Sequence, residues 1–181
     1  MRTNLPITTS EYSLPAGQTL VSVTDLKGRI TYCNPAFITV SGFSRDELLG
    51  QPHNIVRHPD MPEEAFRDMW ATIQAGLPWT GLVKNRRKDG AFYWVRANAT
   101  PMKQGDRITG YLSVRSAPTR DEVQANTALY ARMQEQARAG RQVLALERGR
   151  VVRRDVLGRC LAALTPGQRG RLFGLQVLAL G

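Results

Sequence analysis

Short runs in which hydrophobic and polar residues alternate predict five strands in the first two thirds of the chain. Two strands, Leu20 to Thr24 and Arg29 to Cys33, flank a turn with Asp25 and Gly28. Three more follow a long interval, at Gly81 to Arg87, Ala91 to Thr100 and Ile108 to Arg115. Turn residues with glycine separate these last three, as is typical of hairpins. The pattern therefore predicts a β-rich domain built largely from neighbouring antiparallel strands.

Helical spacing of apolar residues fills the interval between the second and third strands. Asn34 and Ser44 are expected N-caps of two short helices, and Asp60 is the expected N-cap of a longer one that ends at Gly76. The longer helix has one apolar face, made of Ala65, Phe66, Met69, Trp70 and Ile73. Two strands, then helices, then three strands indicate an α+β fold with the helices packed on one face of the sheet.

Four regions differ in pattern along the 181 residues. Residues 1–18 are predicted to be a flexible arm, and residues 19–118 hold the predicted sheet and its helices. A capping box at Thr119 to Glu122 opens an expected connector helix over 119–140, whose apolar periodicity is weak. Residues 141–181 are expected to be a basic tail that leads into a short apolar segment. The length suits one domain with an appendage.

The net charge of +10 comes largely from the tail, where eight arginines face only Glu147 and Asp155. These arginines lack interleaved aromatic residues and match no nucleic-acid-reading motif, so we expect no nucleic-acid partner. Cys33 and Cys160 are far apart and have no metal-ligand spacing. Together with the lack of a signal-peptide pattern, they favour a reduced, cytoplasmic setting.

An apolar run from Leu172 to Leu180 follows the arginines of the tail. Positive charge just before an apolar segment keeps the preceding part of a membrane protein in the cytoplasm. Nine helical residues cover about 14 Å, roughly half the hydrocarbon thickness, so we expect a membrane span that is cut short or only just begins here. An amphipathic surface helix and a segment that packs back on the domain are the alternatives.

The most unusual chemistry lies in the loop from Gln51 to Pro62, which holds both histidines of the chain. Arg57 and His58 can bind phosphate or simply stabilise the loop. His53 can contact a ligand or be a buried, hydrogen-bonded histidine. For Asp60 we favour the role of helix cap over that of a ligand contact. Because no nucleophile–base pair or metal cluster is evident, we do not expect an enzyme.

With these residues in view, the chain from about Leu20 to Ala117 resembles a PAS sensor domain. In detail it resembles the flavin-binding PAS domain of the bacterial aerotaxis receptor family. Asn34 to Phe37 and Ser41 to Phe43 match PAS domains in general, whereas His53 to Pro62 (His-Asn-x-Val-Arg-His-Pro-Asp-Met-Pro) matches the aerotaxis type.

The resemblance implies a five-stranded antiparallel sheet with small helices on one face, followed by a C-terminal helical segment. It also implies FAD held non-covalently between sheet and helices. A dinucleotide needs cations for its pyrophosphate, flat apolar surfaces for its rings and an amide that can both donate and accept at the flavin edge. The candidate cofactor-binding residues are Asn34, His53, Arg57, His58, Asp60, Trp70, Trp79, Asn85 and Arg115.

The roles expected for these residues follow from their chemistry. Arg57 and His58 would hold the pyrophosphate, and Trp70 and Trp79 would provide surfaces for the rings. Asn85, on an inward-facing strand position, would rearrange its hydrogen bonds with the flavin state. An inward Arg115 would place positive charge near the pyrimidine end of the ring, which favours a reduced anionic form.

The resemblance implies a redox or oxygen sensor that signals to a chemotaxis-type, aerotactic output. We expect a homodimer, a downstream signalling module or protein as partner, and a cytoplasmic sensor domain at the inner face of the cell membrane. A haem-binding gas sensor with His53 or His58 as axial ligand is one alternative. A PAS interaction module without a ligand is another, and a visible spectrum separates all three.

Overall fold

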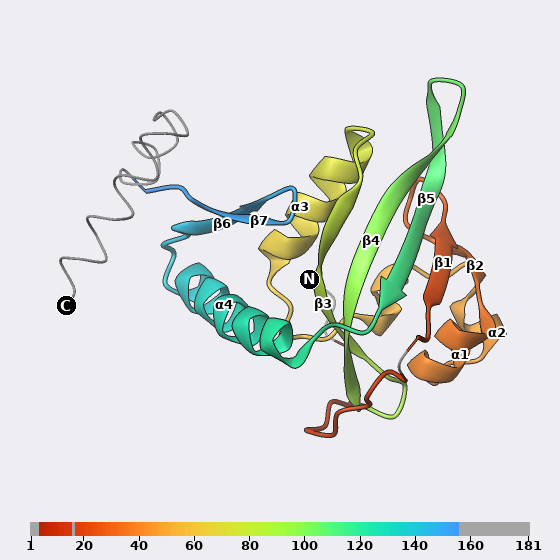
Figure 1. Cartoon of the computed structure of the whole chain (residues 1–181), viewed down its shortest axis with the longest axis horizontal. Helices are drawn as coiled ribbons and strands as arrows, with labels where there is room; N and C mark the ends of the chain where they lie inside the picture. The colour runs from red at the N-terminus through yellow and green to blue at the C-terminus, as the bar shows by residue number, and fades with distance from the viewer. Residues whose placement is uncertain (1–3, 16, 156–181) are drawn as a thin grey trace.

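Five strands form one antiparallel sheet at the centre of the molecule (Figure 1). The structure is a computed structural model that describes residues 4–15 and 17–155. The strand order in the sheet is β2-β1-β5-β4-β3, and this confirms the predicted five-stranded antiparallel sheet. The strands are β1 (Leu20–Thr24), β2 (Ile30–Cys33), β3 (Trp79–Arg86), β4 (Phe92–Gln104) and β5 (Arg107–Ser116).

The inner face of this sheet carries the helices that lie between β2 and β3. They are α1 (Pro35–Ser41), α2 (Arg45–Leu48), the 3-10 helix η1 (His53–Val56) and α3 (Glu63–Gln74). Asn34 caps α1 by accepting from the Phe37 amide, and Ser44 opens α2 with a capping box, as predicted. The one turn of η1 was not predicted, because the loop around it contains prolines and polar residues and gives no periodic apolar pattern.

Apolar residues of the helices pack into one core with the inner face of the sheet, where α1 lies against β1 and α2 against β2. Phe37, Val40 and Leu48 are fully buried, as are Leu20 and Val95 on the strands. Each such side chain stabilises the fold by about 1.5–3 kcal/mol through its removal from water. This packing forms one side of the inner layer and leaves the space under α3 and η1 for the cavity described below.

The start of α3 differs from the prediction. Pro62 occupies the N-cap position and no side chain caps the helix, so the assignment of Asp60 as N-cap is wrong. Asp60 lies too far upstream to reach the first free amides. Its carboxylate instead forms an ion pair with Lys84 Nζ at 2.6 Å.

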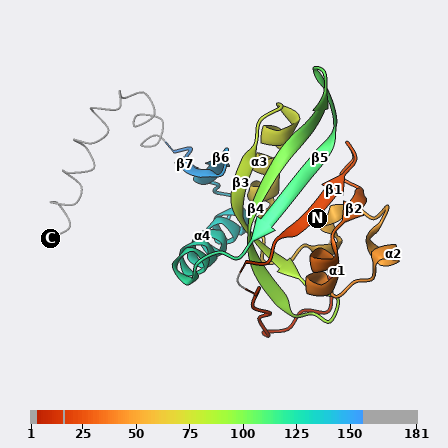
Figure 2. The same cartoon turned by 45° about the vertical axis from the view of Figure 1, so that its right-hand side comes forward.

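The outer face of the sheet is partly covered by α4 (Arg120–Arg138), at the β3 end away from α1 and α2 (Figure 2). The predicted Thr119 capping box is present. Although the apolar periodicity of the expected connector helix is weak, α4 packs against the core. Tyr130 is buried, stacks on Trp94, and donates from its hydroxyl to the Leu82 carbonyl at 2.6 Å. The chain therefore has helices on both faces of the sheet.

The segments before and after the PAS-like sheet, predicted to be a flexible arm and a basic tail, also differ from expectation. Residues 4–15 pack along the β3–β4 turn, with the Thr8 amide donating to the Gly90 carbonyl and the Tyr12 amide donating to the Phe92 carbonyl. A flexible arm is therefore wrong for these residues. After α4, β6 (Leu144–Glu147) and β7 (Arg150–Arg153) form a hairpin within what was expected to be a tail.

Within the described residues, no helix combines the length and the apolar character needed to cross a bilayer. The apolar run from Leu172 to Leu180, on which the expected membrane span rests, lies outside the described residues.

Candidate functional site

A cavity of about 320 Å³ lies between the inner face of the sheet and the layer formed by η1 and α3. Strands β1, β3, β4 and β5 provide one wall, and α3 provides the opposite wall with Phe66, Met69, Trp70 and Ile73. None of the described residues that line the cavity is acidic, whereas Lys27, Arg57 and Arg115 all line it. The cavity therefore combines apolar walls with an excess of positive charge.

Arg115 is the deepest of these cations, with only 5% of its surface exposed. Its guanidinium donates to Ser22 Oγ at 3.0 Å and meets His53 Nε2 at 2.8 Å. Because guanidinium nitrogens only donate, His53 Nε2 must be the acceptor and the ring proton must lie on Nδ1. Burial, and then the charge of Arg115, hold the pKa of His53 well below its usual range. No described carboxylate forms an ion pair with Arg115, so its positive charge is not compensated within the described residues.

Asn85 presents a second unsatisfied group to the cavity. It follows Val83 on the inward-facing side of β3, as the strand alternation predicted, and only 3% of it is exposed. Its amide nitrogen Nδ2 has no acceptor among the described residues. A buried amide donor without a partner costs about 1–3 kcal/mol, so this position fits a ligand that supplies an acceptor.

The mouth of the cavity is formed by the loop after η1 and by the β1–β2 turn. The guanidinium of Arg57 lies over the Phe66 ring, 3.5 Å from its centroid. Asn4 fixes the backbone of this loop by donating to the carbonyls of Asn54 and Arg57. On the other side, Gly28 has a φ of +76°, and a Cβ there would lie 3.0 Å from the Trp70 ring. The structure therefore brings Arg57 and Trp70 to the same opening.

Five of the nine predicted site residues line the cavity, namely His53, Arg57, Trp70, Asn85 and Arg115. The other four lie outside its lining. Asn34 caps α1 and bridges to the Val21 amide and the Thr19 carbonyl. Asp60 pairs with Lys84 at the surface. Trp79, expected to provide a surface for the cofactor rings, is the first residue of β3, and its buried indole donates to Asp68.

His58 is the residue for which the expected role changes most. Its ring is buried, with Nδ1 accepting from the Asp60 amide and its edge against Phe92. Burial, together with the nearby charge of Lys84, lowers its pKa to about 4. It is therefore neutral near pH 7 and supplies no positive charge, so the expected cationic pair reduces to Arg57 alone.

Several lining residues escaped the sequence analysis. These residues lie on the strands and carry small or hydroxyl-bearing side chains. Their alternation with outward-facing residues was the only sequence signal that could have identified them. They are Ser22, Thr24, Ala97, Ala99, Tyr111 and Ser113. Phe66, Met69 and Ile73 were assigned to an apolar helix face, but nothing in that pattern distinguishes cavity lining from core packing.

The free energy of unfolding should decrease as the pH is lowered below 6.5, because both histidines are held neutral in the folded protein. His53 has a pKa well below the usual range and His58 one of about 4, whereas the unfolded chain protonates both near pH 6.5. The unfolded state thus binds more protons between pH 6.5 and 4, and stability is lost as pH falls through that window. Each histidine contributes up to about 1.4 kcal/mol per pH unit. Urea unfolding at pH 7.5, 6 and 5 measures the slope.

A His58→Gln variant is the matched control for this slope. It should lose stability less steeply with falling pH, because one of the two titrating rings is gone. A wild-type free energy of unfolding that is the same at pH 7.5 and pH 5 would contradict the neutral assignment of both rings.

Comparisons with known proteins agree with this architecture. A family model described as the PAS fold matches residues 30–115. The aerotaxis receptor of Escherichia coli strain K12 is 48% identical over 153 residues, which make up 84% of this chain and 29% of that receptor. The nitrogen fixation regulatory protein of Klebsiella pneumoniae is 37% identical over 82 residues, covering 45% of this chain and 17% of that protein. The chain therefore spans less than a third of either relative.

Among solved structures, the PAS domain of a protein from Colwellia psychrerythraea superposes with a TM-score of 0.51 at 27% identity. The match covers 56% of this chain and 86% of that domain. The sheet order, the helices on its inner face and these matches confirm the predicted PAS fold. The chain therefore belongs to the PAS family, and its PAS domain is of the type found in the bacterial aerotaxis receptor.

Proposed function

We propose that this chain is a sensor that binds FAD non-covalently in the cavity and reports its redox state, or the supply of oxygen, to an aerotactic signalling output. The observation that carries the proposal is Arg115, a buried cation in a cavity whose described lining residues include no acid. A buried charge without a partner is costly, so the site favours a ligand with negative charge or strong acceptors at that point.

The other lining groups support a flavin at this place. The walls are apolar and include the Trp70–Tyr111 pair, whose rings meet edge to face at 5.5 Å. A volume of about 320 Å³ is at the lower end of the range of small-molecule sites, roughly 300–1,000 Å³. We infer that the ring system occupies the interior and that the phosphates lie at the mouth, where Lys27 and Arg57 could hold them.

Bound FAD would supply the redox chemistry, because its ring can be reduced and reoxidised. The protein's part would be to respond to the change. Asn85 can rotate its amide so that it donates to an acceptor or accepts from a donor as the ring changes. Arg115 would stabilise negative charge that reduction places on the ring, with neutral His53 and Ser22 holding its guanidinium in position.

The test compares FAD with riboflavin, which lacks phosphates. Arg57→Ala should weaken FAD binding roughly 10-fold to 150-fold, the equivalent of a lost charge-assisted contact of about 1.5–3 kcal/mol, and leave riboflavin binding almost unchanged. Quenching of flavin fluorescence on titration into the apo protein measures both affinities. His58→Ala is the matched control, because the neutral His58 lies outside the cavity lining.

Two results would contradict the FAD proposal. A protein that retains no flavin after purification and binds none on titration would remove it. An Arg57→Ala variant that loses riboflavin as strongly as FAD would place Arg57 at the ring rather than at the phosphates.

A haem-binding gas sensor is the second candidate, with His53 or His58 as axial ligand. His53 Nε2 is already engaged by Arg115 and Ser22, and His58 does not line the cavity. A haem would have to break these contacts. The visible spectrum of the purified protein separates a flavin from a haem, and a colourless protein would favour the interaction module that needs no ligand.

The relatives of this chain support a place for the sensor in a larger assembly. The 48% identity to the aerotaxis receptor, over 84% of the chain, supports a sensory rather than an enzymatic role. We propose a homodimer with a downstream signalling module or protein, and a cytoplasmic sensor held at the inner face of the membrane through the C-terminal segment.

A further inference from the structure

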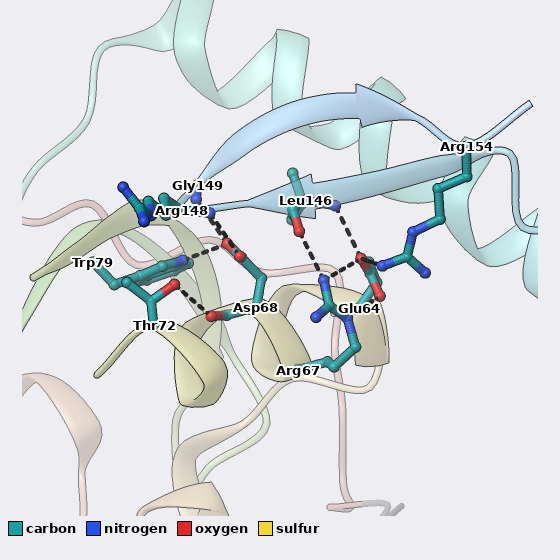
Figure 3. Close-up of polar contacts among 9 residues, drawn as sticks. All are labelled: Glu64, Arg67, Asp68, Thr72, Trp79, Leu146, Arg148, Gly149 and Arg154. Atoms are coloured by element: carbon teal, nitrogen blue, oxygen red, sulfur yellow. Dashed lines mark hydrogen bonds and ion pairs between the residues drawn. The ribbon is translucent and has the colours of Figure 1, made fainter. Parts of the chain in front are cut away.

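The β6–β7 hairpin is attached to α3 by a buried carboxylate (Figure 3). Asp68 is 3% exposed, and its two oxygens accept from three donors. Oδ1 binds the Arg148 amide at 2.7 Å, and Oδ2 binds the Gly149 amide at 2.7 Å and Trp79 Nε1 at 2.8 Å. One side chain therefore joins α3, the start of β3 and the hairpin turn.

A second carboxylate on the same face of α3 fixes the strand before the turn. Glu64 Oε1 accepts from the Leu146 amide at 2.9 Å, and Arg67 Nη2 donates to the Leu146 carbonyl at 2.7 Å. Arg67 and Glu64 are themselves paired at 2.7 Å. Both backbone groups of Leu146 thus bind side chains of α3, as they would bind a neighbouring strand (Figure 3).

The turn that Asp68 holds has an unfavourable backbone. Arg148 has a φ of 53° and is the one described residue other than glycine with a positive φ. Gly149 follows with a φ of 78°, and a Cβ there would lie 2.1 Å from the Thr80 carbonyl oxygen. Two such residues in succession direct their amides to one side, which is an anion-binding arrangement. The carboxylate of Asp68 offsets the strain, so the docked hairpin depends on it.

The same helix forms a wall of the cavity. Phe66, Met69, Trp70 and Ile73 line the cavity, while Glu64, Arg67 and Asp68 face the hairpin. Trp79, which binds Asp68, begins the strand that brings Asn85 to the cavity. A helix moves as a rigid unit, so a shift of α3 caused by what fills the cavity displaces both carboxylates.

We propose that the β6–β7 hairpin is a conformational latch, docked on α3 through Glu64 and Asp68 and held more or less firmly according to what occupies the cavity. The hairpin stands between the PAS domain and residues 156–181, so the latch is placed to pass a change in the cavity toward the C-terminal end of the chain. The identity of the occupant rests on the proposed function, whereas the latch itself rests on these contacts.

The test is hydrogen exchange at the amides of Leu146, Arg148 and Gly149 in the whole chain, with and without FAD. In the wild type, FAD should change these exchange rates at least fivefold. Asp68→Asn replaces the two acceptor oxygens of the carboxylate by one carbonyl oxygen and an NH2 donor, which cannot accept from all three donors. Amide exchange in the hairpin should therefore rise at least tenfold and no longer respond to FAD. Arg148→Asn creates an Asn-Gly turn, which favours this backbone, and should slow exchange several-fold.

Glu135→Gln, an exposed acid on α4, is the matched control and should leave all three rates unchanged. Arg148→Asn keeps the test usable if the Asp68→Asn protein misfolds, because this second variant is expected to stabilise the docked hairpin. Equal rates in apo and FAD-loaded wild type, with binding shown by flavin fluorescence, would overturn the latch. So would an Arg148→Asn protein with wild-type rates.

One further arm does not depend on FAD. Met69→Ala enlarges the cavity from the α3 side and should alter the hairpin rates, whereas Met102→Ala, at an exposed methionine of β4 outside the lining, should not. If FAD fails to bind, the proposed function fails and this arm decides the latch. Hairpin rates that are the same in wild type and Met69→Ala would overturn it.

Discussion

Replacing Arg115 with Met is expected to weaken FAD binding and, at the same time, to raise the melting temperature of the apo protein. The buried guanidinium has no described acidic partner, so its removal relieves the cost of an isolated charge, by about 1–3 kcal/mol. Ser22 Oγ and His53 Nε2, 3.1 Å apart, can then satisfy each other. The flavin would lose charge-assisted contacts of about 1.5–3 kcal/mol, so its affinity should fall roughly 10-fold to 150-fold.

Flavin titration and thermal melts of the apo protein measure the two effects. Arg107→Met is the matched control, because Arg107 lies on the same strand but is exposed. It should change neither quantity. An Arg115→Met protein that binds FAD as the wild type does would show that Arg115 does not face the ligand.

Asp68→Ala is expected to cause the largest loss of stability of any single change on α3. It leaves the buried indole nitrogen of Trp79 without an acceptor and removes the acceptor of the Arg148 and Gly149 amides. Breaking such a buried charged network costs about 3–5 kcal/mol. For a chain of this size the melting temperature should fall by roughly 6–20 °C.

Thermal unfolding followed by tryptophan fluorescence measures this loss. Asp106→Ala, in the exposed turn between β4 and β5, is the control and should be close to wild type. Trp79→Phe should cost less than Asp68→Ala, because it removes one donor while the carboxylate keeps the other two. A melting temperature within about 2 °C of wild type for Asp68→Ala would mean that the network stabilises little.

The five strands and most of the helices were predictable because their signals are local. Alternation marks β1 to β5, and side-chain caps at Asn34, Ser44 and Thr119 mark helix starts through contacts within three residues. Strand alternation also placed Asn85 on the inner face, and the unusual composition of the loop after Gln51 singled out Arg57, which lines the cavity. Each of these conclusions needs only neighbouring residues and the periodicity of one element.

Other features were decided by contacts between distant segments. Trp79 was expected to bind the cofactor and instead donates to Asp68, 11 residues earlier, while Asp60 pairs with Lys84 rather than capping α3. The neutrality of His58 follows from burial, which no local pattern reveals. The predicted tail forms a hairpin although Arg148-Gly149 is a weak turn signal, because Asp68 and Glu64 on α3 hold it.

By itself, then, the sequence determined the sheet, its helical layer and the side of the sheet on which the cavity lies. The tertiary structure decided which of the candidate residues meet in that cavity and that α3 connects it to the hairpin. The physical reason is that periodicity and capping act over a few residues, whereas the burial of a charge and the satisfaction of its hydrogen bonds depend on segments as far apart as Ser22 and Arg115, or Asp68 and Gly149, which are 93 and 81 residues apart.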